Sequence, residues 1–577
     1  MSKSISRRGF VAAAGATTAA AAVAAAAVPA MASEKASSAA VDGAASGNAV
    51  SAWGVEYPWP AEPPAISDAD VEEEVQADVV VVGLGVAGVA AFRSAAEEGV
   101  KVVAIEKGET PQCRSSQYCY VNGTHREDLS LIEVDVDEVC QDEWQSSGLY
   151  ADYAIIRKFV KNEAEVFDWW ANGDSEIYWQ QPGEAVDMMA MMDPNAEVEH
   201  PYMVFSMGSG NVAYETEPQV AYPTLVAFSN HQHVLDENAQ RAIEAGGTAL
   251  YGHFAEQLIV EDGRVAGVYA RNAETGKYKK VLAANGVIMA TGGCEGDKDI
   301  ARTFYPAMME YGNLSAWPNF DVEGNPTNTG DGYRMGYWAG AAFSTFMAPM
   351  CHVMGGPNDV ANMATSMGLT SPHLRLNYNG VRFMNEDSNC SDAEVSLERQ
   401  PKTKCFAIVD SHLDEQATAD AAGSTYTCAS LDAAVDNESI FKGETLEELF
   451  DAIVAYDPDF NKEAAIESVA HYNELCDAGY DDDFCKQEKY LWPVVDGPFY
   501  ASRMGIGLCL TTMGGLYSDA DARVYDNDKH VIPGFYAAGN IQGNRFAVKY
   551  PFKLSGASHA MAMYYGYVAG KNAAQGL

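Results

Sequence analysis

The sequence predicts an α/β fold built around a parallel β-sheet, and three observations support this prediction. An unbroken run of valines at 79–82 is typical of a parallel strand that is buried on both faces. Gly83, Gly85 and Gly88 follow that run directly, and a helical segment comes after them. A second apolar strand at 102–105 ends at an acid. The order of strand, glycine turn, helix and strand predicts a βαβ unit.

The glycine turn predicts a Rossmann-like dinucleotide site. Glycines let backbone N–H groups approach a pyrophosphate, and the positive end of the next helix, at Val86 and Ala87, stabilises its charge. Glu106 stands at the distance where a carboxylate binds ribose hydroxyls, and Lys107 follows it. Because strand, turn, helix and acid all occur in order, we favour this interpretation over a chance glycine turn.

The extreme N-terminus resembles an export signal of the twin-arginine type. Ser6-Arg7-Arg8-Gly9-Phe10-Val11 precedes an alanine-rich apolar stretch and the sequence Ala30-Met31-Ala32. We therefore predict a signal peptide at 1–32 and a mature protein in the cell envelope, outside the cytoplasm; a membrane-anchoring helix is the alternative. Residues 33–76 are rich in Ala, Ser, Gly and Pro, which predicts a linker with little structure.

Composition excludes several classes of function. The chain has 577 residues, which is more than one core usually supports, so we expect at least two domains. A formal charge of −44 argues against binding of nucleic acid or anionic membranes, and it suits solubility or a basic partner. The 11 cysteines form no C-x-x-C motif, so we predict no zinc or c-type haem site. An iron–sulfur cluster built from dispersed cysteines stays open.

The rest of the chain carries recognisable local patterns. Short β-rich runs between 255 and 293 alternate with turn signals, which predicts a meander whose last strand returns to the parent sheet. The turn at 328–332 places another helix N-terminus, with Asp331, near polar ligand atoms. We further expect acid-rich helices at 445–455 and 462–478, a strand at 531–540 and a small-residue helix that opens at 554–559.

Several blocks recur in a fixed order: Gly83–Gly88 with Glu106-Lys107, Ala290–Gly293, Thr329–Gly332, Val381–Glu386, Thr512–Gly515 and Pro533–Asn540. Together they resemble the flavoprotein family of soluble fumarate reductases, succinate dehydrogenase flavoprotein subunits and 3-ketosteroid dehydrogenases. The resemblance covers about 77 to 577 and extends to exported reductases of gut actinobacteria. It implies FAD bound in an extended conformation, in a discontinuous Rossmann-like domain with an inserted α+β capping domain.

By this resemblance, the FAD-binding domain comprises 77–347 and 511–577, and the capping, substrate-binding domain comprises 348–510. The last helix is implied to direct its N-terminal N–H groups at the flavin pyrimidine edge, which would raise the flavin potential. A helix that simply packs on the sheet is the alternative. The implied FAD-binding residues are Gly83, Gly85, Val86, Ala87, Gly88, Glu106, Lys107, Ser115, Ser116, Ala255, Thr291, Gly292, Gly293, Asp331, Asn540, Ser555, Ser558 and His559.

The substrate site departs from the pattern of the family. Fumarate reductases hold a dicarboxylate with two histidines and arginines, and one arginine of the cap protonates the substrate. Here His352 matches one histidine position, Thr511 stands at the other, and Cys390 takes the place of the proton-donating arginine. The carboxylate-clamping arginine falls near Lys553. Because bidentate carboxylate recognition needs guanidinium geometry, we expect a substrate other than fumarate or succinate.

A longer loop before the last helix offers other candidates. It carries Arg545, Lys549, Tyr550 and Lys553, which together can orient a carbonyl, stabilise an enolate and supply a proton. Tyr550 and Lys553 are the preferred donors and Cys390 a less favoured one; a structural role is the alternative for each. The methionine run at 188–192 suits either an adaptable wall or core packing.

We therefore expect an exported FAD-dependent reductase that uses a small unsaturated organic compound as electron acceptor in anaerobic respiration. Hydride would pass from flavin N5 to an activated C=C bond. Electrons would come from a separate donor, which we expect to be a membrane-associated cytochrome, since the sequence carries no haem motif. The alternatives are a dehydrogenase of the 3-ketosteroid type, which the Asn540 position favours, and an electron-transfer flavoprotein without its own substrate.

Overall fold

The fold is known from a computed structural model, in which part of the chain is described. The predicted signal peptide and the methionine run at 188–192 lie outside the described residues. No described helix is both long enough and apolar enough to cross a membrane. The structure describes residues 49–50, 56–57, 59–61, 63, 65–171, 176–186, 197–207, 221–306, 319–354, 372–388, 390–419, 427–435, 440–551 and 553–577.

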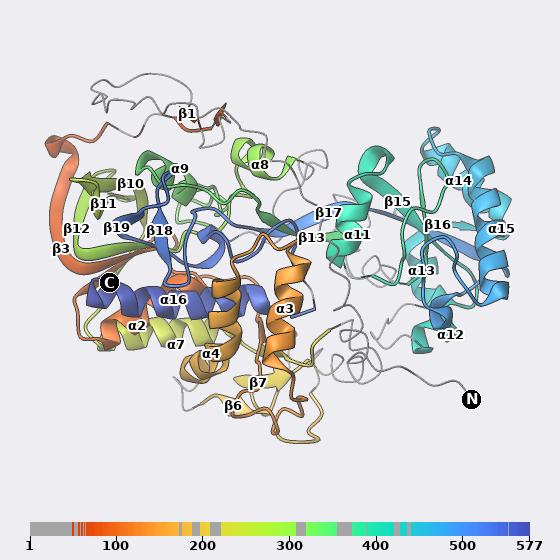
Figure 1. The fold of residues 1–577 in the computed structure, drawn as a ribbon, viewed down its shortest axis with the longest axis horizontal. Coiled ribbons are helices and arrows are strands. Elements are labelled where there is room, and N and C mark those ends of the chain that lie inside the picture. Colours follow the sequence, from red (N-terminus) through yellow and green to blue (C-terminus); the bar gives the residue numbers. More distant parts are fainter. Residues whose placement is uncertain are drawn as a thin grey trace, which may run out of the picture. The chain divides into compact units, whose positions relative to one another are not determined.

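Eight strands form the main sheet of the described part of the chain (Figure 1). Six strands follow the order β10-β11-β12-β3-β4-β9, and β19 pairs with both β12 and β18. Their bounds are β3 Val71–Val82, β4 Val102–Glu106, β9 Thr248–Tyr251, β10 His253–Glu261, β11 Arg264–Asn272, β12 Tyr278–Met289, β18 Arg523–Tyr525 and β19 Val531–Ala537.

The centre of this sheet is parallel and fully buried, as the valine run predicts. β3 pairs in parallel with β4 on one side and with β12 on the other, and Val79, Val80 and Val81 are inaccessible to solvent. The predicted meander is confirmed, because β10, β11 and β12 are antiparallel neighbours and β12 returns to β3. The carboxyl ends of β3, β4 and β12 therefore meet at one edge, where open α/β sheets bind ligands.

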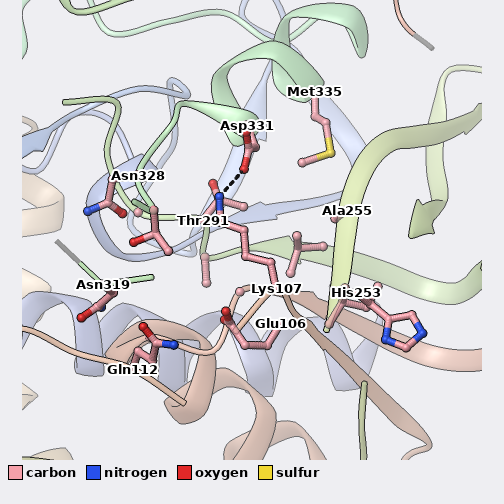
Figure 2. A pocket seen from close by; sticks show the side chains of 17 residues that line it. Glu106, Lys107, Gln112, His253, Ala255, Thr291, Asn319, Asn328, Asp331 and Met335 are labelled. Atoms are coloured by element: carbon pink, nitrogen blue, oxygen red, sulfur yellow. Dashed lines mark hydrogen bonds and ion pairs between the residues drawn. The ribbon is translucent and has the colours of Figure 1, made fainter. Parts of the chain in front are cut away.

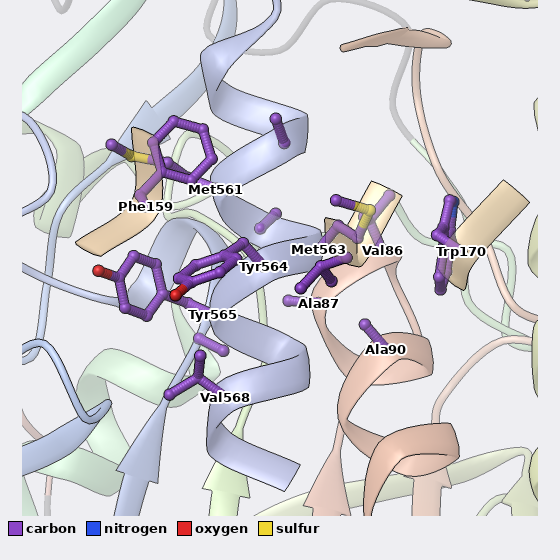
Figure 3. Packing of buried hydrophobic residues seen from close by; sticks show 14 of the residues in the cluster. Val86, Ala87, Ala90, Phe159, Trp170, Met561, Met563, Tyr564, Tyr565 and Val568 are labelled. Carbon is purple, nitrogen blue, oxygen red and sulfur yellow. The ribbon is translucent and has the colours of Figure 1, made fainter. Parts of the chain in front are cut away.

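Helices α2 (Val86–Glu97), α7 (His231–Glu244) and α16 (Ala557–Gln575) cover one face of the main sheet (Figure 1). Figure 3 shows the tight packing of α16 on α2. A Cβ on Gly566 would lie only 2.2 Å from the Ala87 carbonyl oxygen, so the two backbones approach as closely as a glycine permits. The small-residue composition of the last helix is therefore explained by this contact.

A second sheet lies between β12 and β18 in the sequence, so the main sheet is built from two separated segments. It has the order β13-β17-β15-β14, with β16 on β17. Buried residues of this sheet and of the helices at 446–456 and 462–478 form a hydrophobic cluster of their own. The elements are β13 Ala348–Met354, β14 Leu374–Asn377, β15 Lys404–Val409, β16 Ile440–Gly443, β17 Phe499–Met513, α11 Cys390–Leu397, α12 Leu413–Ala419, α13 Cys428–Ala434, α14 Leu446–Tyr456 and α15 Lys462–Ala478.

The remaining elements complete the fold. A four-stranded sheet has the order β5-β8-β7-β6. The end of the segment predicted as a linker also forms structure: β3 starts at Val71, and Trp59 packs against Phe304 and Phe343. The further elements are β1 Ala49–Val50, β2 Glu56–Tyr57, β5 Gln117–Cys119, β6 Tyr178–Trp179, β7 Met203–Ser206, β8 Leu225–Phe228, α3 Val136–Ser146, α4 Tyr153–Ala171, α8 Lys298–Phe304, α9 Asp331–Trp338 and 3-10 turns η1 Asp68–Asp70, η4 Pro401–Thr403, η6 Glu488–Tyr490 and η7 Gly539–Ile541.

Candidate active site

A pocket opens at the carboxyl ends of β3, β4 and β12, at the edge that the parallel sheet predicts (Figure 2). Its walls come from the glycine turn, from the end of β4 and from the N-terminus of α9. The lining residues are Val82, Gly83, Gly85, Ile105, Glu106, Lys107, Gln112, His253, Ala255, Ala290, Thr291, Gly292, Asn319, Thr327, Asn328, Asp331 and Met335.

The three glycines of the first turn serve two different purposes. Gly83 has a φ of +91°, and a Cβ there would lie 2.6 Å from the Ala290 carbonyl oxygen. A Cβ on Gly88 would lie 1.8 Å from the Gly83 carbonyl oxygen, so the chain itself requires both glycines. Gly85, the N-cap of α2, differs, because the nearest atom to its Cβ would be the Gln112 oxygen at 3.6 Å. The space at Gly85 and the free N–H groups of the first helical turn form a cradle for phosphate.

Glu106 holds the glycine turn in place from the end of β4. Its two carboxylate oxygens accept the N–H groups of Leu84 and Gly108, each at 2.7 Å. Burial raises the pKa of Glu106, while these two N–H groups and the charge of Lys107 oppose the shift. A carboxylate oxygen can accept more than one hydrogen bond, so the predicted bond to a ribose hydroxyl is still available to it.

Lys107 and Asp331 close the pocket on the opposite side. The Lys107 ammonium lies 2.9 Å from an Asp331 carboxylate oxygen, an ion pair drawn in Figure 2, and 3.2 Å from the Thr329 hydroxyl. Asp331 is the first residue of α9, where a carboxylate is favoured by the helix dipole. Two residues predicted from separate motifs, 224 positions apart, thus form one side of the pocket.

The turn after β12 supplies an orphaned donor. The buried Thr291 hydroxyl has no hydrogen-bond partner among the described residues. The next residue, Gly292, has a φ of +76°, and a Cβ there would lie 2.4 Å from the Asn328 side-chain oxygen. A polar ligand in the pocket would satisfy the hydroxyl, because buried polar groups are costly without a partner. The pocket therefore offers a dinucleotide a phosphate cradle at the N-terminus of α2 and polar groups around it.

Comparison with known proteins identifies this ligand. The family described as FAD binding domain matches residues 78–552. The chain belongs to this family. It is 28% identical over 531 residues to the vinyl phenol reductase of Lactiplantibacillus plantarum, covering 86% of this chain and 96% of that protein. It is 27% identical over 545 residues to the urocanate reductase of Eggerthella lenta, covering 92% of this chain and 80% of that protein.

The fold also matches solved structures. The 3-ketosteroid-Δ4-(5α)-dehydrogenase of Rhodococcus jostii RHA1 superimposes with a TM-score of 0.63 at 21% identity, over 89% of this chain and 100% of that one. A flavocytochrome c3 fumarate reductase superimposes with a TM-score of 0.56 at 21% identity, over 88% and 79%. The chain is therefore an FAD-dependent oxidoreductase with the mixed α/β fold of fumarate reductases, and FAD is its cofactor.

The other predicted FAD residues lie on several elements. Ala255 lines the pocket from β10. The carbonyl oxygens of Ser115 and Ser116 contact the His231 ring nitrogen and the Phe228 N–H group, at 2.6 and 3.2 Å. Neither serine lines the pocket of Figure 2. Their role toward FAD stays a prediction, as do the roles of Gly293, Ser555 and His559.

The N-terminus of α16 is fixed by its contact with β5. A Cβ on Gly556, which has a φ of +83°, would lie 2.3 Å from the Tyr118 carbonyl carbon. The His559 ring nitrogen lies 3.1 Å from the Gln117 oxygen, and burial lowers the pKa of His559 to about 4. A histidine whose pKa is lowered therefore stands at the positive end of this helix.

Three residues predicted from separate motifs form one hydrogen-bonded chain. The Asn540 amide donates to the Thr511 hydroxyl at 2.7 Å, and Arg545 donates to the Asn540 oxygen at 3.3 Å. The Arg545 side chain is 1% exposed, and its Nη1 atom has no hydrogen-bond partner in the described part of the chain. No described carboxylate forms an ion pair with Arg545, and burial lowers the pKa of its guanidinium to about 10. Arg545 is thus a buried cation, held by neutral groups and charged at neutral pH.

Tyr550 lies in the same loop and is equally buried. Its hydroxyl accepts the Ser558 N–H at 3.2 Å, at the start of α16. Burial raises the pKa of Tyr550, whereas the Ser558 N–H and the Arg545 charge act in the opposite direction. Tyr550 therefore keeps its proton in this structure, and the Ser558 N–H and the Arg545 charge would stabilise its phenolate.

The two lysines of the loop are paired with carboxylates. The Lys553 ammonium forms an ion pair with Asp142 and lies 4.6 Å from the centre of the Tyr222 ring. Lys549 forms an ion pair with Asp392. Their positive charges are therefore compensated within the chain, unlike the charge of Arg545.

Two predicted catalytic residues have side chains outside the described part. His352 belongs to β13, where its backbone lies opposite Leu508 of β17. Cys390 is the first residue of α11. Their catalytic roles stay predictions.

Sequence reasoning missed Glu295, which follows Gly293 by two residues. Glu295 is inaccessible to solvent and binds the Arg114 guanidinium at 2.7 Å. It also accepts hydrogen bonds from Asn328 at 2.7 Å and from the Thr512 hydroxyl at 3.1 Å. An acid two residues after a Thr-Gly-Gly turn is the sequence signal for this network. No cluster of three metal-ligating side chains occurs among the residues that the structure describes.

Proposed function

We propose that this flavoprotein reduces an activated C=C bond of a small α,β-unsaturated carbonyl or carboxylate compound. The observation that carries the proposal is the buried, uncompensated charge of Arg545, whose Nη1 atom has no partner among the described residues. A buried cation is costly unless something in the functional state pairs with it. The oxygen of an activating carbonyl group would do so, and it becomes more negative as the C=C bond is reduced.

The neighbouring side chains assign the steps. Asn540 and Thr511 orient Arg545 through their hydrogen bonds, so its free edge is aimed at the activating oxygen. When bound, FAD supplies a hydride from N5 to the β-carbon. Tyr550 gives its proton to the α-carbon, and the Ser558 N–H at the positive end of α16 stabilises the resulting phenolate.

The pairing of the lysines supports a substrate other than fumarate. A dicarboxylate would need a second cation, but Lys549 and Lys553 are bound to Asp392 and Asp142. Relatives are named for the reduction of vinyl phenol and urocanate, which are larger than fumarate and are not dicarboxylates. We propose that residues 348–510 form the capping domain that closes over such a substrate.

We further propose that the protein is exported and acts as a terminal reductase in anaerobic respiration. The support is the twin-arginine motif at Arg7 and Arg8. The sequence carries no C-x-x-C-H motif for haem, so electrons would come from a separate donor. A membrane-associated cytochrome is the proposed donor, because relatives include flavocytochrome fumarate reductases.

A pair of anaerobic assays tests the direction of the reaction. Reduced methyl viologen would drive the purified holoenzyme against fumarate, methyl acrylate, cinnamate, urocanate, 4-vinylphenol and a steroid enone. We expect turnover with at least one of the larger compounds and little with fumarate. Turnover only in the reverse assay, with saturated ketones and a dye acceptor, would identify a dehydrogenase of the 3-ketosteroid type. No turnover in either assay would identify an electron-transfer flavoprotein.

A further inference from the structure

We propose that Glu143 is a proton-relay residue that returns a proton to Tyr550 after each turnover. This inference rests on the proposed function, in which Tyr550 protonates the substrate. It concerns a residue of α3, an element that carries none of the motifs of the flavin site.

Glu143 is a buried carboxyl at the back of the loop that carries Tyr550. Glu143 is only 2% exposed, and its carboxyl accepts a hydrogen bond from the Leu554 N–H. Its Oε1 atom has no hydrogen-bond partner among the described residues. One oxygen is therefore anchored to the loop four residues after Tyr550, and the other is available for proton exchange.

The groups on the two sides of Glu143 form a route. On the inner side, Glu143 interacts electrostatically with Tyr550, which in turn interacts with Arg545. On the outer side lies Asp142, the adjacent residue of α3. Asp142 accepts the Tyr222 hydroxyl at 2.6 Å and pairs with Lys553, and both ionic side chains are partly exposed. The carboxyl of Glu143 is thus coupled electrostatically to the buried Tyr550, and the residue next to it in α3 belongs to a partly exposed ion pair.

The surroundings of Glu143 favour its protonated form. Burial and the negative charge of Asp142 raise its pKa, and the Leu554 N–H and the Lys553 charge oppose this. The other titratable groups that face it are Tyr550, Tyr222, Cys119 and Cys140. A carboxyl whose pKa is raised holds its proton more readily and is better suited to deliver it than an ionised carboxylate, which has none to give.

The relay balances with the proposed reaction. The Tyr550 O–H bond breaks as the α-carbon–hydrogen bond forms, and the two electrons arrive as hydride from the reduced flavin. The Glu143 O–H bond then breaks and the phenol of Tyr550 is restored. The Glu143 carboxylate regains a proton from water at the Asp142 edge, so each turnover consumes one solvent proton.

Glu143→Gln separates this relay from a structural role, because it removes the exchangeable proton and keeps the size of the side chain. In the first turnover Tyr550 already holds its proton. We therefore expect an unchanged single-turnover reoxidation of the dithionite-reduced variant, and a steady-state rate with methyl viologen at least ten-fold below wild type. Acetate or imidazole in the buffer should restore part of the steady-state rate by supplying the proton.

Glu163→Gln is the matched control. Glu163 of α4 is also fully buried, also accepts a backbone N–H, from Val121, and also has one oxygen without a partner in the described residues. The neighbouring charge that raises the pKa of Glu163 is that of Asp168. We expect this variant to match wild type in both assays, with the acceptors of the panel above used in turn as probes.

The outcomes separate the two proposals. If no acceptor reoxidises the wild-type flavin, the proposed function fails. If wild type turns over and Glu143→Gln does so at the same steady-state rate, or slows equally in the first turnover, the relay is contradicted. If the Gln variant loses its flavin, Glu143→Asp replaces it: a shortened carboxyl should slow only the steady state, and equal slowing of both phases would overturn the relay.

Discussion

The nucleotide pocket and the buried Arg545–Tyr550 loop are built on different principles. In the pocket, most polar groups satisfy one another: Glu106 binds two N–H groups, and Lys107 pairs with Asp331. In the loop, the cation of Arg545 is held by a neutral amide, and its Nη1 atom has no hydrogen-bond partner among the described residues. Backbone geometry determines the shape of the nucleotide pocket. The loop is determined by side chains, and one of its buried donors has no partner in the described part of the chain.

This difference explains which region can vary. A dinucleotide has the same pyrophosphate in every relative, so close backbone contacts at Gly83 and Gly88 suit all of them. An acceptor differs from one enzyme to the next, and a loop can change its side chains without disturbing the sheet. Substitutions should therefore separate folding and flavin binding from turnover.

The largest effect is expected at the glycine turn. Gly88→Ala places a Cβ 1.8 Å from the Gly83 oxygen, so the turn cannot form and the protein should lose both flavin and fold. Gly85→Val is the sharper variant, because the chain leaves room there. It should retain the melting temperature of the apoprotein but bind little FAD, as read from the ratio of absorbance at 450 and 280 nm. Wild-type flavin content in Gly85→Val would show that Gly85 does not face the phosphates.

Arg545→Met should instead reduce turnover without reducing stability. Removal of a buried charge that lacks a carboxylate partner should leave the melting temperature equal or higher. Turnover of the best acceptor should fall by about 10²–10³-fold, the typical cost of losing one donor to a developing oxyanion. Arg545→Lys is the matched control, since it keeps the charge but loses the planar fork and should recover only part of the rate. A loss of stability with unchanged turnover would make Arg545 a structural residue.

Fold prediction was accurate where local patterns decide the structure. The valine strand, the meander, the turn before Asp331 and the last helix are confirmed, because periodicity and turn residues encode them. The pairing of Lys553 with Asp142 was out of reach, since the two residues are 411 positions apart. Glu143 was overlooked for the same reason: a lone acid in an acid-rich helix gives no sign that the fold buries it.

Part of the pH dependence of stability should arise at His231, the first residue of α7. Burial lowers the pKa of His231 to about 3, against 6.5 for an exposed histidine, so the folded state binds fewer protons than the unfolded state. The free energy of unfolding should therefore be unaffected by this group above pH 6.5. It should decrease as the pH falls from 6.5 toward 3, by up to about 1.4 kcal/mol per pH unit. In urea titrations, His231→Phe should flatten this slope. A slope equal to wild type would show that His231 does not titrate with unfolding.

The smallest effect is expected at Lys553. Because its charge is paired with Asp142 near the surface, Lys553→Met should change turnover less than about ten-fold. The variant should also retain the bound-flavin spectrum. A loss comparable to that of Arg545→Met would restore Lys553 as the proton donor and remove Tyr550 from that role.

The most direct test is anaerobic stopped-flow reoxidation of the dithionite-reduced wild-type protein by one equivalent of each unsaturated compound. We predict that at least one larger α,β-unsaturated carbonyl or carboxylate compound reoxidises the flavin and yields its saturated product, with one hydrogen from solvent. A flavin that stays reduced with every compound, yet reoxidises at once with ferricyanide, would contradict it.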